Sequence, residues 1–476
     1  MEVSGQTTRQ IDRRTSLLVV AFILALAIWK LGPITPLQLA FFVVGALFLF
    51  GLKKPVLAMA AFLVSLLTLN NYILAAPFGI EISLRVLLVL LIAVIVWKTY
   101  GLRGLELGPY AKRVIVVALI LVAITVIANL INTGWDWTFK DLRQTGTGLL
   151  LIVLIPAVTR DLRDLKTLCG LALLFMAASA AVAVMQHFNI LGMSDRTLVS
   201  GYTNIDNRMP GMAQDPLDLA FVLAPVVPAA LFVYLNKGTR ANIRWLILAA
   251  VILMVLGMYF TYTRSAVIAA ALGVVTLFLF LPKHLRFKVL LAVVVVALLV
   301  FLVSQAHQTR LVSSEDVSAQ SRIVLRQAGY DIMRDHPIWG IGAYKFPEVS
   351  VQYASRLDPN VMQILGKDLG LLQPHNDFVY VGACYGIPAL IAYVFILGIV
   401  FLTLLHSYRT ARRRFIKGLS AGLIGALVAY LVNAYYHNCL ISMPFFWVLN
   451  GFSLAVAKLA MAEKKMQQEE PTSTGS

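Results

Sequence analysis

The sequence has 476 residues, of which 59% are hydrophobic and only 13% are charged. Its mean hydropathy of +0.82 is far above that of a water-soluble domain, so a soluble fold is excluded. The net charge of +17 would suggest a nucleic-acid partner on a soluble protein, but here most lysines and arginines fall in every second connector between apolar runs. That pattern reports the orientation of a membrane protein.

Apolar runs long enough to cross a bilayer recur along the chain. They lie near residues 16–31, 36–51, 55–75, 82–98, 113–131, 146–159, 167–188, 216–236, 244–262, 264–281, 286–304, 378–406, 416–436 and 441–460. Several of these runs are short. The sequence therefore predicts an all-α, polytopic membrane protein with roughly 12 to 14 transmembrane helices.

Basic connectors alternate with short or polar ones, which predicts that both termini lie in the cytoplasm. The one long polar segment then lies outside, in the periplasm of a Gram-negative cell, where we expect a partly helical loop that carries the site. Other outside connectors are expected at 132–145, 189–215 and 435–443. The predicted domains are N-terminal spans at 1–305, the loop at 306–377, three closing spans at 378–460 and a disordered cytoplasmic tail at 461–476.

Within the loop, residues 318–336 have helical spacing that places Arg322, Arg326 and Gly329 along one stripe. Two guanidiniums one turn apart can bind a phosphate or diphosphate. The alternative is a solvated helix face. The segment ends at His336, which we interpret as a turn residue before the flexible glycines Gly340 and Gly342.

His375 lies in a polar cluster directly before the next apolar run. A neutral imidazole is suited to act as general base toward a hydroxyl acceptor. The alternative is an interfacial histidine that hydrogen-bonds the start of the helix, with Asp377 as its N-cap.

Arg264 begins an apolar run on the predicted outer side of the membrane. Membrane proteins concentrate lysine and arginine on the cytoplasmic side, so an arginine at this position is an exception that needs a reason. It either contacts a ligand or extends to lipid phosphate. Arg208 lies in the second-longest outside connector, where pairing with Asp206 or Asp215 explains it as well as substrate contact does. Arg85 and Asp218 are rare ionisable residues near span ends.

Several signatures are absent from the sequence. It has no phosphate-binding loop of the GxxxxGK[ST] type and no clustered carboxylates on an outside connector. Cys169, Cys384 and Cys439 have no spacing that indicates a disulfide or a zinc site. We therefore expect no cofactor and no metal. No internal repeat is evident, which disfavours a transporter built from inverted repeats.

Together these residues resemble the O-antigen ligase and O-antigen polymerase superfamily of lipid-linked glycosyltransferases. The resemblance covers roughly residues 200–400. It rests on Thr263-Arg264-Ser265, on Ser321-Arg322 with Tyr330, on His336-Pro337-Ile338 with Gly340-Ile341-Gly342 and Phe346, and on Pro374-His375-Asn376-Asp377 with Gly386-Ile387.

The resemblance implies transfer of a polysaccharide from an undecaprenyl diphosphate carrier to a sugar hydroxyl of lipid A–core at the periplasmic face of the bacterial inner membrane. The glycosyl diphosphate bond already carries the activation, so neither nucleotide nor metal is implied. His375 would be the base, and Arg264 with Arg322 would hold the diphosphate as its charge grows. Such displacement would invert the anomeric carbon.

The remaining candidate residues have supporting roles under the same resemblance. Arg208 and Arg326 would contact the diphosphate or the acceptor, and Tyr330 and Asn376 would orient the reacting groups. We expect a monomer that acts on membrane lipids.

Other functions stay open at this point. The superfamily also includes polymerases that join repeat units and enzymes that move glycans to protein side chains. The compact single loop favours a ligase. A transporter of lipid-linked glycans would predict more ionisable residues in the middle of the spans.

Overall fold

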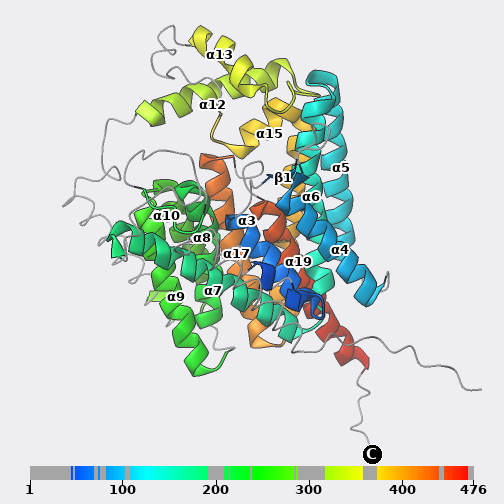
Figure 1. The fold of residues 1–476 in the computed structure, drawn as a ribbon, viewed down its shortest axis with the longest axis vertical. Helices are drawn as coiled ribbons and strands as arrows, with labels where there is room; N and C mark the ends of the chain where they lie inside the picture. The colour runs from blue at the N-terminus through cyan, green and yellow to red at the C-terminus, as the bar shows by residue number, and fades with distance from the viewer. Residues whose placement is uncertain are drawn as a thin grey trace, which may run out of the picture.

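A computed structural model describes residues 44–46, 49–68, 73–75, 82–101, 108–190, 208–213, 215–235, 239–283, 286–287, 317–357, 373–438 and 444–469. Within these residues the chain is almost entirely helical (Figure 1), so the predicted all-α, polytopic class is confirmed. The predicted spans at 16–31, most of 36–51 and nearly all of 286–304 lie outside the described residues.

The helices follow one another along the chain with short connections. They are α3 Pro55–Thr68, α4 Leu84–Tyr100, α5 Pro109–Asn132, α6 Trp135–Val158, α7 Leu162–His187, α8 Pro216–Leu235, α9 Ala241–Phe260, α10 Arg264–Thr276, α12 Val317–Asp335, α13 Phe346–Leu357, α15 Asp377–Tyr385, α16 Ile387–Thr410, α17 Arg414–Tyr436 and α19 Phe445–Glu469. A 3-10 turn, η4 Leu277–Leu279, extends α10. Two short antiparallel strands, β1 Ile73–Ala75 and β2 Ile82–Ser83, were not predicted.

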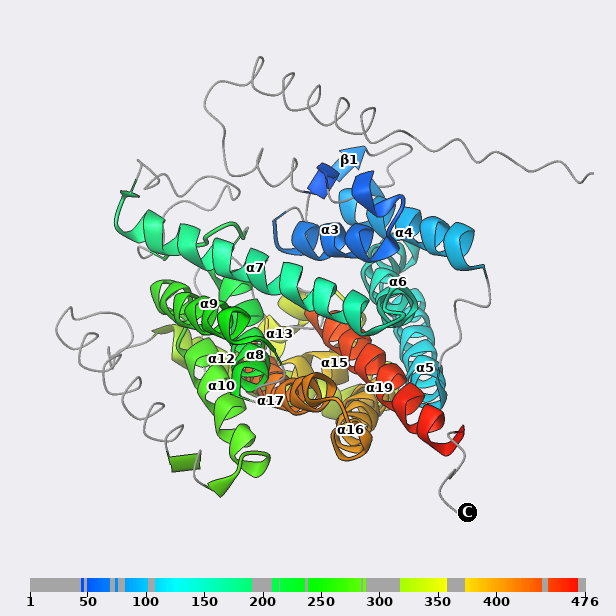
Figure 2. The same cartoon turned by 90° about the horizontal axis from the view of Figure 1, so that it is seen from below.

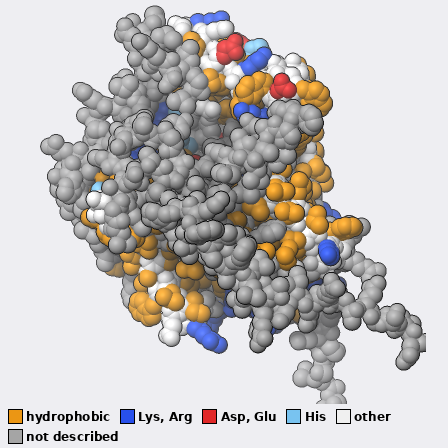
Figure 3. Space-filling view, viewed as in Figure 1, with side chains coloured by type: hydrophobic (Ala, Val, Ile, Leu, Met, Phe, Trp, Pro, Cys, Tyr) orange, Lys and Arg blue, Asp and Glu red, His pale blue; other side chains and the backbone are white. Residues whose placement is uncertain are grey.

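Among the described helices, eight are long and apolar enough to cross a membrane: α5, α6, α7, α8, α9, α16, α17 and α19. Two shorter apolar segments are Pro55–Leu66 in α3 and Arg264–Leu279 in α10 and η4. Hydrophobic side chains cover the flank of the bundle below α12 and α13 (Figure 3). Such a flank suits contact with lipid and would be unusual on a soluble domain.

The centre of the bundle is formed by α8 and α17, which pack against each other. On one side they contact α9 and α10, and on the other α17 contacts α16 and α19 (Figures 1 and 2). Among the described candidate spans, α17 is the most deeply buried. This buried position fixes α17 in the bundle, so that the residues at its end have defined positions.

At one end of the bundle, which we call the basic end, the Lys166 Nζ lies 5.1 Å from the centroid of the Phe415 ring. At the basic end, Arg413 pairs with Glu463 at 3.2 Å and the Lys458 Nζ donates to the Pro156 carbonyl. At the other end, which we call the lid end, α12 and α13 cover the bundle (Figure 1). There Asn132 at the end of α5 donates from Nδ2 to the Trp339 carbonyl at 3.3 Å.

The expected single span at 378–406 is wrong, because the chain forms two helices that meet at Gly386. Gly386 has φ +89°, a conformation that favours glycine, and a Cβ there would collide with the Ile338 carbonyl. Ile387 N donates instead to the Pro337 carbonyl at 2.7 Å. The short helix α15 is thereby separated from α16 and held under the lid.

The expected outside connector at 132–145 is also largely wrong, because α6 begins at Trp135. The predicted span at 146–159 is only the second half of this helix. Charged residues lower the hydropathy of its first half, but the buried Asp141 accepts hydrogen bonds from Asn129 Nδ2 at 2.8 Å and from the Tyr385 hydroxyl at 3.1 Å. These hydrogen bonds compensate for the burial of the Asp141 carboxylate, so the helix can include this residue within the bundle.

Candidate active site at the lid end

His375 lies just before α15 with a backbone that side chains rarely adopt. Its φ is +46°, which for a residue other than glycine costs about 1–3 kcal/mol and persists only where the surroundings enforce it. The enforcement comes from Asn438. Its Oδ1 accepts from Asn376 N at 3.0 Å, and its Nδ2 donates to Gln373 Oε1. The chain around His375 is therefore held by contacts on both sides of this residue.

Asn376, and not Asp377, is the N-cap of α15. Its Oδ1 accepts from Val379 N at 3.0 Å, so the predicted cap at Asp377 is wrong. Asp377 is fully buried beneath the site, where its Oδ2 accepts from the Tyr393 hydroxyl at 3.0 Å and from the Tyr430 hydroxyl at 3.2 Å. These bonds fix the start of α15 to α16 and α17.

The stripe of α12 identified in the sequence faces α15. A Cβ at Gly329 would collide with Val379 Cγ1, and one at Gly382 in α15 would lie 2.6 Å from Met333 Cε. Glycine at these positions lets the two helices approach closely. Because Arg322 and Arg326 continue the same stripe toward the start of α12, the close packing directs both toward His375.

Arg326 also contacts the end of α17. Its Cζ lies 4.6 Å from the centroid of the Tyr435 ring, and its Nη2 donates to the Tyr435 carbonyl at 3.4 Å. Its half-buried side chain thus ties the lid to the bundle, in addition to placing a positive charge near His375.

A second histidine, His437, belongs to the site and was not predicted. Its ring meets that of His375 edge to face with centroids 5.1 Å apart, and it lies 4.5 Å from the Phe221 ring. The sequence did contain a signal, because His437-Asn438 repeats the dipeptide His375-Asn376 in another connector at the same end. The two dipeptides contact each other directly through Asn438.

Arg208 is bound to the corner between α9 and α10. Its Nε donates to the Thr261 carbonyl at 2.7 Å and its Nη2 to Thr263 Oγ1 at 2.8 Å. Arg264 follows Thr263 directly, begins α10 and is half-buried. The corner therefore brings Arg208 and Arg264 to the same end of the bundle as His375.

Positive charge dominates this site. Burial, and then the charges of Arg322 and Arg326, lower the pKa of His375 to about 4. Burial, His375, Arg322 and Arg208 lower the pKa of His437 well below its usual value. Both imidazoles are consequently neutral at pH 7 and can accept a proton, while the surrounding arginines attract an anion.

Two further residues of the sequence motif lie apart from this cluster. Tyr330 is 47% exposed on α12, and His336 is exposed at the end of the same helix, with its N donating to the Ile332 carbonyl at 2.8 Å. The position of His336 agrees with a turn residue. No described contact brings Tyr330 to His375.

The turn after His336 holds the far end of α15. Ile341 N donates to the Ala383 carbonyl at 3.0 Å and Gly342 N to the Cys384 carbonyl at 2.8 Å. Gly340 and Gly342 have φ of +58° and +82°, so the glycines supply the expected backbone freedom. Ala343 N donates to Asn129 Oδ1 at 2.7 Å, which ties the turn to α5.

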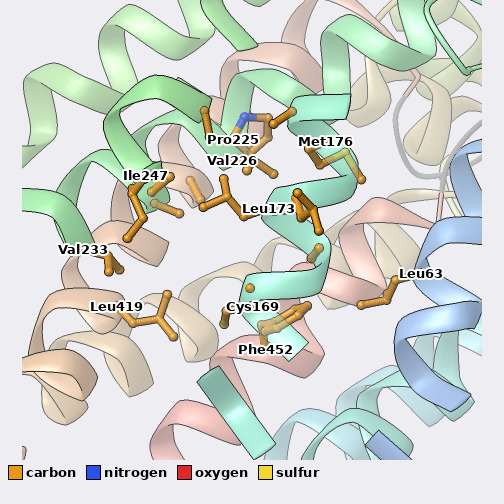
Figure 4. Close-up of a pocket in the computed structure, with 18 of the residues that line it drawn as sticks. Leu63, Cys169, Leu173, Met176, Pro225, Val226, Val233, Ile247, Leu419 and Phe452 are labelled. Atoms are coloured by element: carbon orange, nitrogen blue, oxygen red, sulfur yellow. The ribbon is translucent and has the colours of Figure 1, made fainter. Parts of the chain in front are cut away.

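An apolar cavity of about 890 Å³ opens elsewhere in the bundle, between α7, α8, α9, α17 and α19 (Figure 4). Leu173, Val226 and Ile247 are among its lining residues, and no site residue named above lines it. Its few cationic neighbours include Lys166 and Arg240. Carbon surface of this kind accommodates a hydrocarbon chain and offers no group for catalysis.

Comparisons with known proteins bear on one part of the chain. Residues 249–394 match the family model described as O-antigen ligase. No curated protein matches the chain. The matched segment contains Arg264, Arg322 and His375, whereas Arg208 and His437 lie outside it. Over residues 249–394, the chain is therefore similar to the O-antigen ligase family.

Proposed function

We propose that the protein is an O-antigen ligase. It transfers a polysaccharide from undecaprenyl diphosphate to a sugar hydroxyl of lipid A–core at the periplasmic face of the inner membrane. The observation that carries this proposal is the neutral His375, held in a strained backbone conformation beside Arg322 and Arg326. A proton acceptor next to an anion-binding group is what a glycosyl diphosphate donor requires.

His375 accepts the proton of the acceptor hydroxyl. As that O–H bond breaks, the hydroxyl oxygen forms a bond to the anomeric carbon of the donor, on the face opposite the diphosphate. The bond between the anomeric carbon and the diphosphate oxygen breaks and leaves its electron pair on that oxygen. One direct displacement of this kind inverts the anomeric configuration.

The arginines stabilise the departing diphosphate. Arg322 donates hydrogen bonds from a planar guanidinium whose geometry matches phosphate oxygens. Its charge stabilises the transition state most, because negative charge grows on the diphosphate there. Arg264, at the start of α10, also holds the diphosphate. Arg208 is a weaker contact, because Thr261 and Thr263 already accept from two of its donors.

Asn376 orients His375 through the backbone, since it caps α15 and donates its own N–H to Asn438. Arg326 positions the lid on Tyr435 and adds positive charge. Tyr330 is proposed to contact the sugar from the exposed surface of α12. The apolar cavity supports the proposal of a lipid substrate, because an isoprenoid chain needs such a surface.

Complementation of a Gram-negative strain that lacks its ligase tests the function. The wild-type gene should restore lipopolysaccharide capped with O-antigen, seen as a ladder on a gel. If it lengthens glycan on the carrier lipid and leaves the core uncapped, the protein is a polymerase. If glycan appears on proteins, it is a protein glycosyltransferase. A glycan phenotype that depends on transport alone would contradict the enzymatic proposal altogether.

A further inference from the structure

Exposed tryptophans lie at both ends of the described spans. Trp97 near the end of α4 and Trp245 near the start of α9 lie toward the basic end. Trp135 and Trp137 at the start of α6, and Trp339 after α12, lie at the lid end. Membrane proteins concentrate tryptophan at the two interfaces between lipid and water, because the indole ring is apolar but its N–H needs a polar partner. The lid end therefore carries the side chains of a membrane interface.

The length of α5 matches the thickness of a bilayer. Near its start, the Tyr110 ring lies 5.4 Å from the His406 ring close to the end of α16. At about 1.5 Å per residue, the stretch from Tyr110 to Asn132 is about 33 Å long, and the hydrocarbon core of a bilayer is about 30 Å thick. Outward side chains of this stretch, such as Ile120 and Ile131, are apolar and exposed. The end of α5 at Asn132 therefore reaches the interface on the lid side.

The turn of the lid at residues 336–342 contacts the ends of two spans. Asn132 Nδ2, at the end of α5, donates to the Trp339 carbonyl at 3.3 Å. Ile387 N, at the start of α16, donates to the Pro337 carbonyl at 2.7 Å. In Figure 1 the lid ends of α5 and α6 rise beside α12. The turn therefore lies level with the ends of these spans.

The side chains of this turn lie beside the tryptophans of α6 and add to the exposed apolar surface there. Trp135 is 70% exposed, Ile338 58% and Trp339 38%. Trp137 and Ile387 are exposed as well. We call these five residues the interfacial patch. Apolar side chains gathered on an exposed surface mark contact with a partner or with a membrane.

A lipid surface fits the interfacial patch. The patch continues the exposed apolar faces of two spans, through Ile131 on α5 and Ile391 on α16. Lys140 Nζ lies 4.8 Å from the centroid of the Trp137 ring. A lysine beside a tryptophan suits this layer, because its stem packs on apolar groups while its ammonium extends to lipid phosphate. The same lipid that covers the spans can therefore cover the patch.

We propose that residues 337–339 of the lid are inserted into the interface of the leaflet on the lid side, where the interfacial patch contacts the glycerol and upper acyl region of phospholipids. This inference is independent of the proposed ligase function. Ile341 N and Gly342 N hold the end of α15, so insertion of the turn places that end near the depth of the headgroups. The nine residues of α15 span about 14 Å, which keeps His375 within reach of this layer.

The test measures the depth of single residues in the full-length protein, reconstituted in vesicles of phosphatidylethanolamine and phosphatidylglycerol. A nitroxide spin label is attached to one cysteine at a time, after the three native cysteines are replaced by alanine. Oxygen concentrates in lipid and a nickel chelate in water, so the ratio of their collision rates with the label reports depth. Ile120→Cys in the middle of α5 calibrates the hydrocarbon, and Ser355→Cys on α13 calibrates water.

Ile338→Cys and Trp135→Cys should both give an oxygen-to-nickel ratio several times that of Ser355→Cys and below that of Ile120→Cys. A ratio at position 338 equal to that of Ser355→Cys would place the turn in water. Lipid contact at position 135 alone would anchor α6 but not the lid. A label at position 338 that is shielded from both reagents would show that protein, such as a second copy, covers the patch. Each of these three results overturns the inference.

A second measurement keeps the native cysteines and decides the question if the cysteine-free protein does not fold. Lipids that are brominated in the upper acyl chain quench the fluorescence of tryptophans that they touch. The quenched amplitude should fall in Trp339→Phe. It should not change in Trp447→Phe, the matched control, because Trp447 is buried inside the bundle. An equal quenched amplitude in Trp339→Phe and wild type would contradict insertion of the turn.

Discussion

The chemistry of His375 depends on its charged neighbours. Burial and two arginines keep the imidazole neutral in the unliganded protein, but a base with a pKa of about 4 accepts a proton weakly. A bound diphosphate would offset the charges of Arg322 and Arg326 and raise that pKa. We propose that the bound donor thereby makes His375 a stronger base, whereas in the free protein the His375 imidazole is neutral.

This coupling predicts a difference between two pH profiles. The acid limb of kcat/KM for the donor reports the free enzyme and should fall near pH 4, because His375 is protonated only below its lowered pKa. The acid limb of kcat reports the bound state and should lie at higher pH. Steady-state rates from about pH 3 to about pH 8 give both profiles. Coincident limbs would show that the diphosphate does not act on the base.

Arg322→Lys should lower kcat/KM for the donor about ten- to hundredfold. A lysine keeps the charge but loses the planar pair of donors that matches phosphate. Arg334→Lys is the matched control, since Arg334 is exposed in the last turn of the same helix. Full activity of Arg322→Lys in a reconstituted assay would remove this residue from the diphosphate site.

The sequence alone predicted those candidate site residues that have a recognisable residue type and spacing. It located His375 and the stripe of Arg322, Arg326 and Gly329, and the structure brings the charges of this stripe into range of His375. His437 was missed because its partner lies 62 residues away and only tertiary packing joins them. The N-cap was assigned to Asp377 instead of Asn376, because both residue types cap helices well and the sequence does not show where the helix begins.

At the scale of elements, the contact between α12 and α15 sets the position of the arginines. Gly329 allows α12 to approach Val379, and the lid is further fixed by the Tyr353 hydroxyl, which donates to Asp335 Oδ2 at 2.8 Å. A small change in this contact would move Arg322 relative to His375 without touching either residue.

Gly329→Ala tests this contact. Alanine is the better helix former by about 1 kcal/mol, so propensity alone predicts higher stability. We expect lower activity and no gain in Tm, because the added Cβ collides with the stiff side chain of Val379. Gly398→Ala in α16 is the control, since nothing lies within 4 Å of its Cβ position. Equal effects on activity and Tm in the two variants would argue against close packing at Gly329.

Most elements could be predicted from apolar runs, and the errors have a common cause. The first half of α6 has low hydropathy because it carries Asp136, Lys140 and Arg143, yet it is helical. The division between α15 and α16 occurs inside a continuous apolar run, where only Gly386, with its positive φ, and Pro388 in the first turn of α16 mark it. Hydropathy predicts which segments lie in lipid. It does not predict a charged segment whose side chains are hydrogen-bonded inside the bundle, nor a helix break at a single glycine.

For the whole molecule, the open question is which end of the bundle faces the periplasm. The alternation of charge predicts which helix ends lie together, and contacts such as Asn132 with Trp339 and Arg413 with Glu463 agree with it. We propose that the lid end faces the periplasm, where a lipid-linked glycan meets its acceptor.

Cysteine labelling tests this orientation in a variant with the three native cysteines replaced by alanine. Ser355→Cys on α13 should react with a membrane-impermeant maleimide once the outer membrane is permeabilised, because Ser355 is exposed at the lid end. Lys464→Cys near the end of α19 should react only after the inner membrane is lysed. The reverse pattern would place the site in the cytoplasm and contradict the proposed orientation.

The most direct measurement is transfer by the purified protein in proteoliposomes, with a polyprenyl-diphosphate-linked glycan as donor and lipid A–core as acceptor. Wild type should join them, and His375→Ala should fold normally but lower kcat about 10²- to 10⁴-fold, the usual contribution of a general base. His336→Ala, which removes an exposed histidine of the same loop, should retain activity. Transfer by His375→Ala at the wild-type rate would contradict the assignment of the base.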